Sequence, residues 1–304
     1  MSKKVDIIVV NWNAGEKTLR AVLPYINHES SVINCNVIIV DNASIDNSTT
    51  ILKKDVKKII KNDINVGFGK ACNQAFYGSD ADYILLLNPD TISNPFVLEK
   101  LVEFLEKNQD YAVVGPSQVD ENRNVLRTCG RFPTFKTSLF EILGLSKMFP
   151  TFFTSAPIMK DWDHLQSKDV DHVMGSYMLI RKLILERVGF MDEDYFVYFE
   201  DLDLSKRIND IGFKTFYHHK YSIIHEGGGT GQRVEEYRLF YSLYSRFTYW
   251  KKHLRKTSCF ILTSLSLTVE PPFRVVDSVI KTKKFRLKKI GKAYFLYLRK
   301  IISG

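Results

Sequence analysis

Short apolar runs alternate with amphipathic stretches over the first two thirds of the chain. Consecutive Val, Ile and Leu residues are typical of strands buried on both faces of a sheet, and the stretches between them repeat their apolar positions with helical spacing. Strands and helices that alternate in this way predict a doubly wound, mostly parallel α/β sheet. We expect strands over residues 5–10, 36–40, 56–60, 83–87 and 113–115, helices over residues 16–26 and 94–107, and a helix that the loop 65–69 opens and that runs through residue 76.

Residues 132–171 interrupt this alternation. They are rich in Phe, Pro, Ser and Thr and show one short helical pattern, over residues 137–145. Such a segment is either a mobile lid or acceptor-binding loop, or a packed insertion without a role in recognition, and the sequence leaves both open. We expect one domain over residues 1–232 that contains this insertion. Its remaining elements are a strand over residues 173–180, helices over 181–188 and 200–211, and a strand over 214–224.

Residues 233–304 form a second region, which is helical in pattern and strongly basic. The chain has a formal net charge of +9, and residues 246–304 hold 15 Lys and Arg against 2 Asp and Glu, so the rest is mildly acidic. The aromatic residues of segment 233–254 would pack against the domain, another subunit or a membrane. Residues 281–300 mix basic and apolar side chains, as helices on anionic membranes do. No nucleic-acid-binding module accompanies this charge.

The composition makes several other classes of protein unexpected. A chain with 45% hydrophobic and 25% charged residues is typical of a folded, soluble-type core. The apolar run 5–10 is too short for a secretory signal, and the run 260–269, which Pro271 and Pro272 follow, is too short to span a membrane. The four cysteines form no CxxC pair, so we expect reduced thiols in a cytoplasmic protein, without a disulfide or a zinc site.

Three of the predicted strands end in polar side chains. Asn11 and Asn13 follow the first strand, Asp41 follows the second, and Asn88 and Asp90 follow the strand over residues 83–87. Open α/β sheets bind their ligands at the carboxyl ends of their strands. Polar groups that gather at that edge predict a nucleotide or phosphate site.

Asp90 has two interpretations. Pro89 fixes its own φ and keeps Asn88 extended, so the Asp90 carboxylate would lie at the end of a buried strand, where it suits a divalent cation. Alternatively, Asp90 caps the helix expected from about Asn94. The glycine-containing loop 65–69 lets backbone N–H groups approach an anion at a helix N-terminus, although its spacing matches neither a P-loop nor a dinucleotide fingerprint.

Glu200, Asp201 and Asp203 follow an aromatic stretch at the start of a predicted helix. The helix dipole accounts for Asp203, but it accounts less well for the other two acids. Neighbouring carboxylates that repel each other should raise the pKa of at least one of them, which suits a general base. His225 stands at a predicted strand end before three glycines, where it is either a ligand or a structural histidine.

Seven motifs in one order resemble those of family 2 glycosyltransferases, over about residues 5–230. This resemblance implies a GT-A fold and glycosyl transfer with inversion. The Asn-Pro-Asp motif is most similar to that of bacterial rhamnosyltransferases, which use dTDP-L-rhamnose to build surface polysaccharides such as O-antigen, capsule or cell wall. The motifs are residues 10–13, 40–44, 65–69, 87–90, 175–176, 200–203 and 225–228.

The resemblance also implies how the donor and a cation are bound. Asp41 would accept a hydrogen bond from the pyrimidine N3–H, and Asp90 would ligate Mg²⁺ or Mn²⁺ on the diphosphate, with His225 completing the metal shell. Asn88 stands where many family members have a first Asp, which removes one anionic contact. The other residues implied to bind the donor are Val10, Asn11, Asn13, Asn42, Asn65, Gly67, Gly175 and Ser176.

Asp201 would deprotonate the acceptor hydroxyl, with Glu200 as the second candidate for the base. The implied acceptor is a lipid-linked saccharide at the inner face of the cell membrane. Three alternatives remain: a UDP-sugar donor, a nucleotidyltransferase, and an inactive module that binds a nucleotide sugar or a membrane. A glycine-rich first loop bearing Lys or Arg is missing, which disfavours the nucleotidyltransferase, and the presence of Asp90, Asp201 and His225 disfavours the inactive module.

Overall fold

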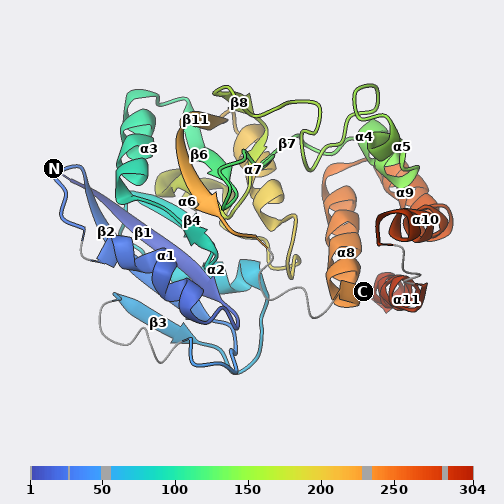
Figure 1. Cartoon of the computed structure of the whole chain (residues 1–304), viewed down its shortest axis with the longest axis horizontal. Coiled ribbons are helices and arrows are strands. Elements are labelled where there is room, and N and C mark those ends of the chain that lie inside the picture. The colour runs from blue at the N-terminus through green and yellow to red at the C-terminus, as the bar shows by residue number, and fades with distance from the viewer. Residues whose placement is uncertain (1, 27, 49–55, 228–234, 283–286, 304) are drawn as a thin grey trace.

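The computed structural model describes residues 2–26, 28–48, 56–227, 235–282 and 287–303. A nine-stranded mixed sheet forms its centre, in the order β3-β2-β1-β4-β10-β6-β11-β5, with β8 paired to β11 (Figure 1). The strands of this sheet are β1 (Lys3–Asn11), β2 (Ile33–Asp41), β3 (Lys58–Lys61), β4 (Tyr83–Leu87), β5 (Thr91–Ile92), β6 (Tyr111–Val119), β8 (Lys168–Val170), β10 (Tyr177–Arg181) and β11 (Lys214–His225); a two-stranded sheet pairs β7 (Cys129–Gly130) with β9 (His172–Val173).

Helices cover both faces of the large sheet. One apolar core joins α1 and α3 to the sheet, and a second core joins α2, α6 and α7 to its opposite face. This arrangement confirms the predicted doubly wound architecture. The helices of this part of the chain are α1 (Glu16–Ile26), α2 (Phe68–Phe76), α3 (Pro95–Lys107), α4 (Phe135–Ile142), α5 (Leu145–Met148), α6 (Lys182–Val188) and α7 (Glu200–Asp210).

Strand β4 shows why a continuous apolar run indicated a central strand. All five of its residues are buried. Successive side chains of a strand point to opposite faces, so Ile84 and Leu86 enter one core while Leu85 and Leu87 enter the other. Burying each such side chain contributes about 1.5–3 kcal/mol. The strand therefore fixes the middle of the sheet and brings its carboxyl end beside that of β1, with which it pairs in parallel.

Residues 172–181 differ from the single strand predicted over residues 173–180. The chain leaves β9 after Val173 and starts β10 at Tyr177, which pairs antiparallel with both β4 and β6. Between them, the backbone N–H of Gly175 donates to a carboxylate oxygen of Asp201 at 2.8 Å. At Gly175, a hydrogen bond to helix α7 thus takes the place of hydrogen bonds to a neighbouring strand. The sheet as a whole is mostly parallel.

Four helices, α8 (Glu235–His253), α9 (Lys256–Thr268), α10 (Glu270–Thr282) and α11 (Leu287–Ser303), follow the sheet. They gather at the right of Figure 1, beside α4 and α5 from the insertion. Pro271 and Pro272 lie in the first turn of α10, where proline is tolerated, so the chain bends there and continues as a helix. The domain boundary predicted between residues 232 and 233 lies outside the described residues.

Within the described ranges, no single helix is long and apolar enough to cross a membrane. Helices α9 and α10 meet the criterion only as a pair, over Lys256–Thr268 and Glu270–Val279, and a bend of 45° separates them.

The insertion packs against the C-terminal helices. The indole N–H of Trp250 on α8 donates to the hydroxyl of Ser138 on α4 at 3.0 Å. Ile142, Tyr249 and Leu262 are buried in the same apolar cluster. Residues 135–142 are thus a packed part of the fold, and the expected short helix appears as α4 and α5. A role of this segment in acceptor binding stays a prediction.

Candidate active site

The loops after β1 and β2 are joined at their first polar residues. Asn11 lies opposite Asp41 in the parallel pairing, and its side-chain amide donates to the Asp41 carboxylate at 2.8 Å. Asn11 is completely buried, and its amide oxygen accepts from the hydroxyl of Thr18 at 2.7 Å. Asn11 therefore orients the Asp41 carboxylate, which lies at the edge of the sheet with 6% of its surface exposed.

A second set of amides ties the next two loops together. The Asn42 side chain donates to the Asn65 side chain at 3.0 Å and to the carbonyl of Gly67 at 3.1 Å. The Asn65 oxygen in turn accepts from the backbone N–H of Gly67 at 3.0 Å. On the first loop, the backbone N–H of Asn13 donates to Ser44 at 2.9 Å, and Val10 is half-buried beside it. The seven predicted donor residues of these three loops thus lie at one edge of the sheet: Val10, Asn11, Asn13, Asp41, Asn42, Asn65 and Gly67.

Strained backbone surrounds this edge. Asn13 has a φ of 52° and Ala43 a φ of 63°, while Tyr198 and Phe199, just before α7, have φ values of 71° and 69°. Such conformations cost of order 1–3 kcal/mol each and concentrate at functional sites. Gly67 has a φ of 89°, and a Cβ there would come within 2.5 Å of a backbone carbonyl of the segment that leads to α7. The donor loop and that segment are therefore closely packed.

Asp90 and His225 meet at the predicted metal position. His225 pairs with Thr91 across the antiparallel β11–β5 ladder, which places its Nε2 3.4 Å from Asp90 Oδ1. Burial raises the pKa of Asp90, but the hydrogen bond and charge of His225 outweigh burial and leave that pKa below its usual value. The capping alternative for Asp90 is wrong, because the side chain of Asn94 caps α3 by accepting from the N–H of Phe96.

The polypeptide around Asp90 is joined to the region of the predicted base. The N–H of Asn88 donates to the carbonyl of Ser176 at 2.9 Å, and the Ser176 hydroxyl donates to Gln118 at 2.9 Å. Among the described residues, no group of three or more His, Cys, Asp or Glu side chains could hold a metal by itself. Asp90 and His225 offer one carboxylate and one imidazole. This set fits a cation whose remaining ligands are diphosphate oxygens and water. Gly228 of the same motif lies outside the described residues.

Asp201 lies at the start of α7, where two backbone amides hold its carboxylate. The N–H of Gly175 donates to Oδ2 and the N–H of Leu202 donates to Oδ1, each at 2.8 Å. A Cβ at residue 175 would lie 3.0 Å from Oδ2, so glycine permits the close approach. About a fifth of the Asp201 side chain is exposed, at 19%. These hydrogen bonds orient the carboxylate and leave part of it accessible to a substrate.

Glu200 has a different environment from its neighbour. It is 5% exposed, and its Oε2 has no hydrogen-bond partner among the described residues. Burial first, and repulsion from Asp201 second, raise the pKa of Glu200 well above its usual value. The sequence predicted that at least one of these acids would have a raised pKa, and the structure attributes that pKa to Glu200. The accessible carboxylate of the pair is Asp201.

Asp203 is neither a helix cap nor part of the site. It is fully buried and bonded to Arg207 on its own helix and to Lys252 and His253 on α8. Burial raises its pKa, but these partners, His253 first, lower it to about 2. Asp203 therefore anchors α7 to the C-terminal helices.

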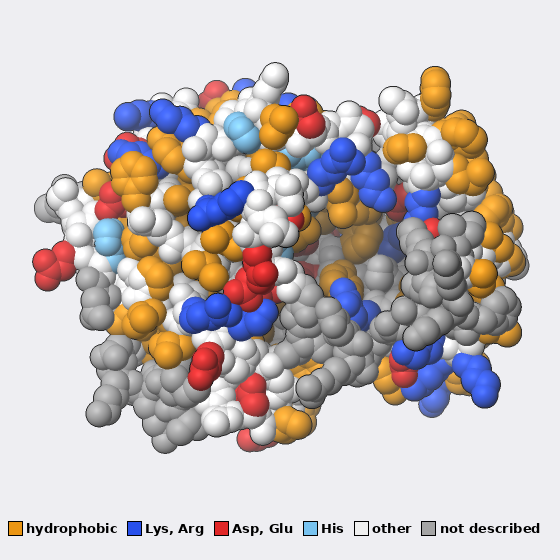
Figure 2. Space-filling model, in the orientation of Figure 1, with side chains coloured by type: hydrophobic (Ala, Val, Ile, Leu, Met, Phe, Trp, Pro, Cys, Tyr) orange, Lys and Arg blue, Asp and Glu red, His pale blue; other side chains and the backbone are white. Residues whose placement is uncertain are grey.

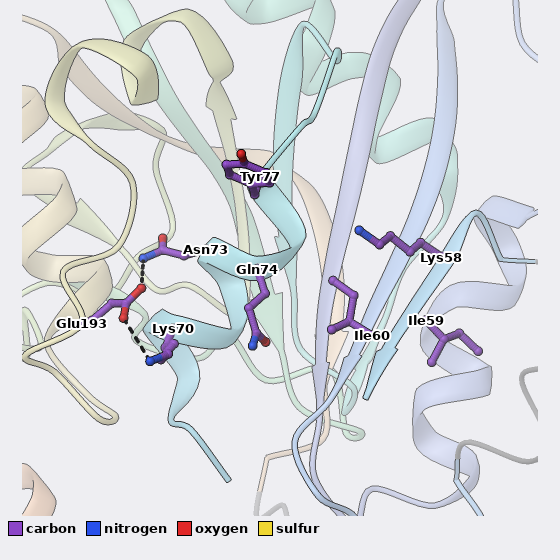
Figure 3. Close-up of a pocket in the computed structure, with 8 residues that line it drawn as sticks. All are labelled: Lys58, Ile59, Ile60, Lys70, Asn73, Gln74, Tyr77 and Glu193. Atoms are coloured by element: carbon purple, nitrogen blue, oxygen red, sulfur yellow. Dashed lines mark hydrogen bonds and ion pairs between the residues drawn. The ribbon is translucent and has the colours of Figure 1, made fainter. Parts of the chain in front are cut away.

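A cavity of about 670 Å³ lies away from these residues, between β3 and α2 (Figure 3). Glu193 at its edge bonds to Asn73 at 3.0 Å and to Lys70 at 3.7 Å. None of the predicted site residues lines it. In Figure 2 the surface is also hollowed between the sheet domain and the C-terminal helices, and charged side chains of both signs border that hollow.

Sequence reasoning missed the side chains that support the site. They are single polar residues without a motif of their own, and only their position opposite a site residue shows what they do. They are Thr18, Ser48, Asn62, Gln74, Gln118, His172 and Ser205.

Comparison with known proteins identifies the family to which this chain is similar. The family model described as "Glycosyl transferase family 2" matches residues 6–189, more than half of the chain. The N-acetylglucosaminyl-diphospho-decaprenol L-rhamnosyltransferase of Mycobacterium tuberculosis is 22% identical over 204 residues, which cover 62% of this chain and 66% of that protein. The rhamnosyltransferase WbbL of Escherichia coli is 29% identical over 167 residues, which cover 54% and 58%. This chain therefore matches less than two thirds of the length of either relative.

Solved structures show the same fold at low identity. The mannosyltransferase PcManGT from Pyrobaculum calidifontis, in complex with GDP-Man and Mn2+, superposes with a TM-score of 0.54 at 13% identity and covers 100% of this chain and 76% of its own. Residues 1–349 of S. aureus TarS superpose with a TM-score of 0.51 at 13% identity and cover 99% and 92%. The predicted GT-A fold is confirmed, and by the family match the chain belongs to glycosyl transferase family 2.

Proposed function

We propose that this chain transfers a hexose, with inversion and with the help of a divalent metal, from a nucleotide diphosphate sugar to a saccharide hydroxyl. The observation that carries this proposal is the arrangement of two carboxylates at one edge of the sheet. Asp90 lies beside His225, Asp201 lies beside Gly175, and the backbone bond from Asn88 to Ser176 connects the two positions. Both carboxylates remain partly accessible, so one can face a diphosphate while the other faces an acceptor.

Asp90 and His225 would hold Mg²⁺ or Mn²⁺ together with the diphosphate oxygens. When bound, such a cation stabilises the negative charge that builds up on the leaving diphosphate. The solved mannosyltransferase is in complex with Mn2+, which supports the choice of metal by analogy of fold. Asn88 contributes a neutral amide where a second carboxylate would add charge.

Asp201 would act as the general base. Inversion requires one base on the face of the sugar opposite the leaving group, and the backbone amides of Gly175 and Leu202 orient this carboxylate. It takes the proton of the acceptor hydroxyl while the acceptor oxygen bonds to the anomeric carbon. The bond from that carbon to the diphosphate oxygen breaks, and its electron pair leaves with the nucleoside diphosphate.

Asp41 would read the base of the donor by accepting its N3–H. That contact suits both thymine and uracil, and we propose dTDP-L-rhamnose because two relatives, from M. tuberculosis and E. coli, are named rhamnosyltransferases. A UDP-sugar is the competing donor. Thermal stabilisation by dTDP-rhamnose and by UDP-sugars, each with and without Mn²⁺, distinguishes the two, and stabilisation by UDP-sugars alone would overturn the rhamnose assignment.

We also propose that the acceptor is lipid-linked and that the C-terminal helices rest on the cytoplasmic face of an anionic membrane. Exposed apolar side chains recur along the outer faces of α10 and α11, and basic residues such as Lys288 and Arg299 flank them. Figure 2 shows hydrophobic side chains along the right-hand edge of the molecule, with Lys and Arg below them. Among the side chains that the structure describes, the large exposed apolar ones of α9, α10 and α11 are Phe260, Ile261, Phe273, Val276, Val279, Leu287, Phe295, Leu298 and Ile302.

A sedimentation assay with lipid vesicles tests the membrane proposal. The protein should bind vesicles of phosphatidylglycerol more strongly than those of phosphatidylcholine, because only the first attract the basic flanks. The double variant Phe295→Glu with Ile302→Glu should lose binding, whereas Leu23→Glu, likewise exposed but on α1, should retain it. If the double variant binds normally, or changes the oligomeric mass instead, the surface is not a membrane interface.

The base assignment is tested with two conservative substitutions. Asp201→Asn keeps the size of the side chain and one of its two accepting oxygens but cannot take a proton, so donor affinity and folding should survive while kcat falls about 10²-fold or more. Glu200→Gln should retain turnover. If Glu200→Gln is inactive and Asp201→Asn is active, the base is Glu200.

A further inference from the structure

His172 lies directly behind Asp201, although no pattern in the sequence connects the two residues. Its Nε2 is 3.6 Å from Asp201 Oδ2, and its Nδ1 is 3.0 Å from the hydroxyl oxygen of Ser205. Ser205 is one helical turn after Asp201, and its hydroxyl donates to the Asp201 backbone carbonyl at 2.9 Å. The imidazole thus bridges the carboxylate and the helix that carries it.

The hydrogen bonds determine which nitrogen carries the proton. Ser205 has one hydroxyl proton, and its bond to a carbonyl uses that proton, since a carbonyl can only accept. The bond between Ser205 and Nδ1 therefore takes its proton from Nδ1. A neutral imidazole protonated at Nδ1 has a lone pair at Nε2, which faces the Asp201 carboxylate. Two acceptors face each other there, and their separation of 3.6 Å is longer than a normal hydrogen bond.

The surroundings of His172 keep it neutral in the resting protein. It is buried, and burial lowers its pKa, although the charges of Asp201 and Asp171 act in the opposite direction. Asp171 is next to it in sequence, and Glu200 adjoins Asp201 on α7. The neighbouring strand β7 contributes Cys129 and Gly130, neither of which is charged.

We propose that His172 is a positioning residue that orients the Asp201 carboxylate and shares the proton that this carboxylate removes from the acceptor. The inference rests on Asp201 as the base and deepens that proposal. When Asp201 takes a proton, the lone pair of Nε2 can accept it in a hydrogen bond, which replaces the contact between two acceptors. The pair therefore holds a proton more strongly than Asp201 would hold it alone, and Asp201 becomes a stronger base.

Two substitutions at residue 172 separate proton sharing from packing. His172→Phe keeps a ring in the buried space that the imidazole fills but removes both nitrogens. The value of kcat should therefore fall about tenfold or more, with an unchanged KM for the donor. The acidic limb of the pH profile of kcat/KM should move to lower pH, because the base holds its proton less strongly. His172→Gln places an amide group near the position of Nε2. It should recover part of the rate and move the acidic limb part of the way back towards its wild-type pH.

A structural role alone would lower activity without moving the acidic limb, so an unmoved limb in His172→Phe would overturn the proposal. If His172→Phe does not fold, Ser205→Ala gives the same test, since the imidazole then loses the acceptor for its Nδ1 proton. NMR of ¹⁵N-labelled histidine offers a readout that does not depend on turnover. We expect the wild-type His172 protonated at Nδ1, and a proton at Nε2 would contradict the inference.

The control for the base itself is Asp201→Asn measured beside these variants. Activity of Asp201→Asn across the pH range would remove Asp201 as the base and with it the proposed mechanism. Inactive Asp201→Asn together with an unchanged pH profile in His172→Phe would leave the proposed function intact and reject only the role of His172.

Discussion

The sheet domain and the C-terminal helices both bury carboxylates, but they surround them differently. At the sheet edge, the Asp90 carboxylate lies 3.4 Å from Nε2 of His225, and 14% of its side chain is exposed. In the helical region, Glu270 is 3% exposed and accepts from Arg246, Arg274 and Ser266. A carboxylate whose acceptor sites are filled holds helices together, whereas one with free acceptor capacity can bind a cation or a proton.

The two regions also differ in how many apolar side chains they leave exposed. The apolar residues of the sheet are enclosed by helices on both faces, while the C-terminal helices bury an ion-pair network and leave many apolar side chains outside. These helices also enclose buried apolar clusters, so their exposed apolar side chains are additional to those of a core. This difference supports the proposals that the first region carries the active site and that the second lies on a membrane.

The largest effect should come from removing the carboxylate of Asp90, which has free acceptor capacity, and it should appear in the rate of transfer. Asp90→Ala should abolish transfer and weaken diphosphate binding, a loss of several kcal/mol or about a thousandfold in rate, because the leaving group loses its counter-charge. Asp80→Ala, at an exposed ion pair with Lys4, is the matched control. Full activity of Asp90→Ala, or of the wild type in EDTA, would mean that no metal is held there.

Removing the carboxylate of Glu270, whose acceptor sites are filled, should lower the stability of the protein. Glu270→Ala leaves the buried Arg246 unpaired and should lower the free energy of unfolding by about 3–5 kcal/mol. Glu236→Ala breaks an exposed pair with Lys292 and should leave the free energy of unfolding almost unchanged, because water and salt screen exposed charges. Urea unfolding measures both. A stable Glu270→Ala variant would show that the two kinds of carboxylate do not differ in this way.

The dependence of stability on pH sharpens the comparison. The folded pKa of Asp203 is lowered to about 2, so its contribution is present above the unfolded pKa of about 4 and is lost as the pH falls from 4 to 2. That contribution is roughly 2–3 kcal/mol. Urea unfolding of the wild type and of Asp203→Asn between pH 2 and 6 measures it. If the free energy of unfolding depends on pH in the same way in both proteins, Asp203 does not make this contribution.

The smallest predicted effect concerns the recognition of the base. Asp41→Ala should weaken the binding of dTDP and of UDP by about 1–3 kcal/mol, because a charge-assisted hydrogen bond is lost from each. Asp110→Ala, on an exposed turn far along the sheet, serves as the control. Calorimetric titration of both nucleotides gives the affinities, and unchanged values for both would remove Asp41 from the site.

Much of the catalytic domain could be predicted from the sequence. Apolar runs such as residues 83–87 identify buried strands, because every residue of the run must enter a core. The polar residues that end these strands, Asp41 and Asp90, could be placed at one edge, because parallel strands share the direction in which they end. The order of the motifs indicated the family, and the excess of Lys and Arg near the C-terminus was visible in the composition.

Only the tertiary structure decided which polar groups face one another. Asp203 and Lys252 are 49 residues apart and Arg246 and Glu270 are 24 apart, and no local pattern specifies such pairs. His172 acquires its proposed role in the reaction only because β9 ends against the first turn of α7. Periodicity along a chain records which side chains are buried, but the partner of a buried polar group depends on how distant elements pack.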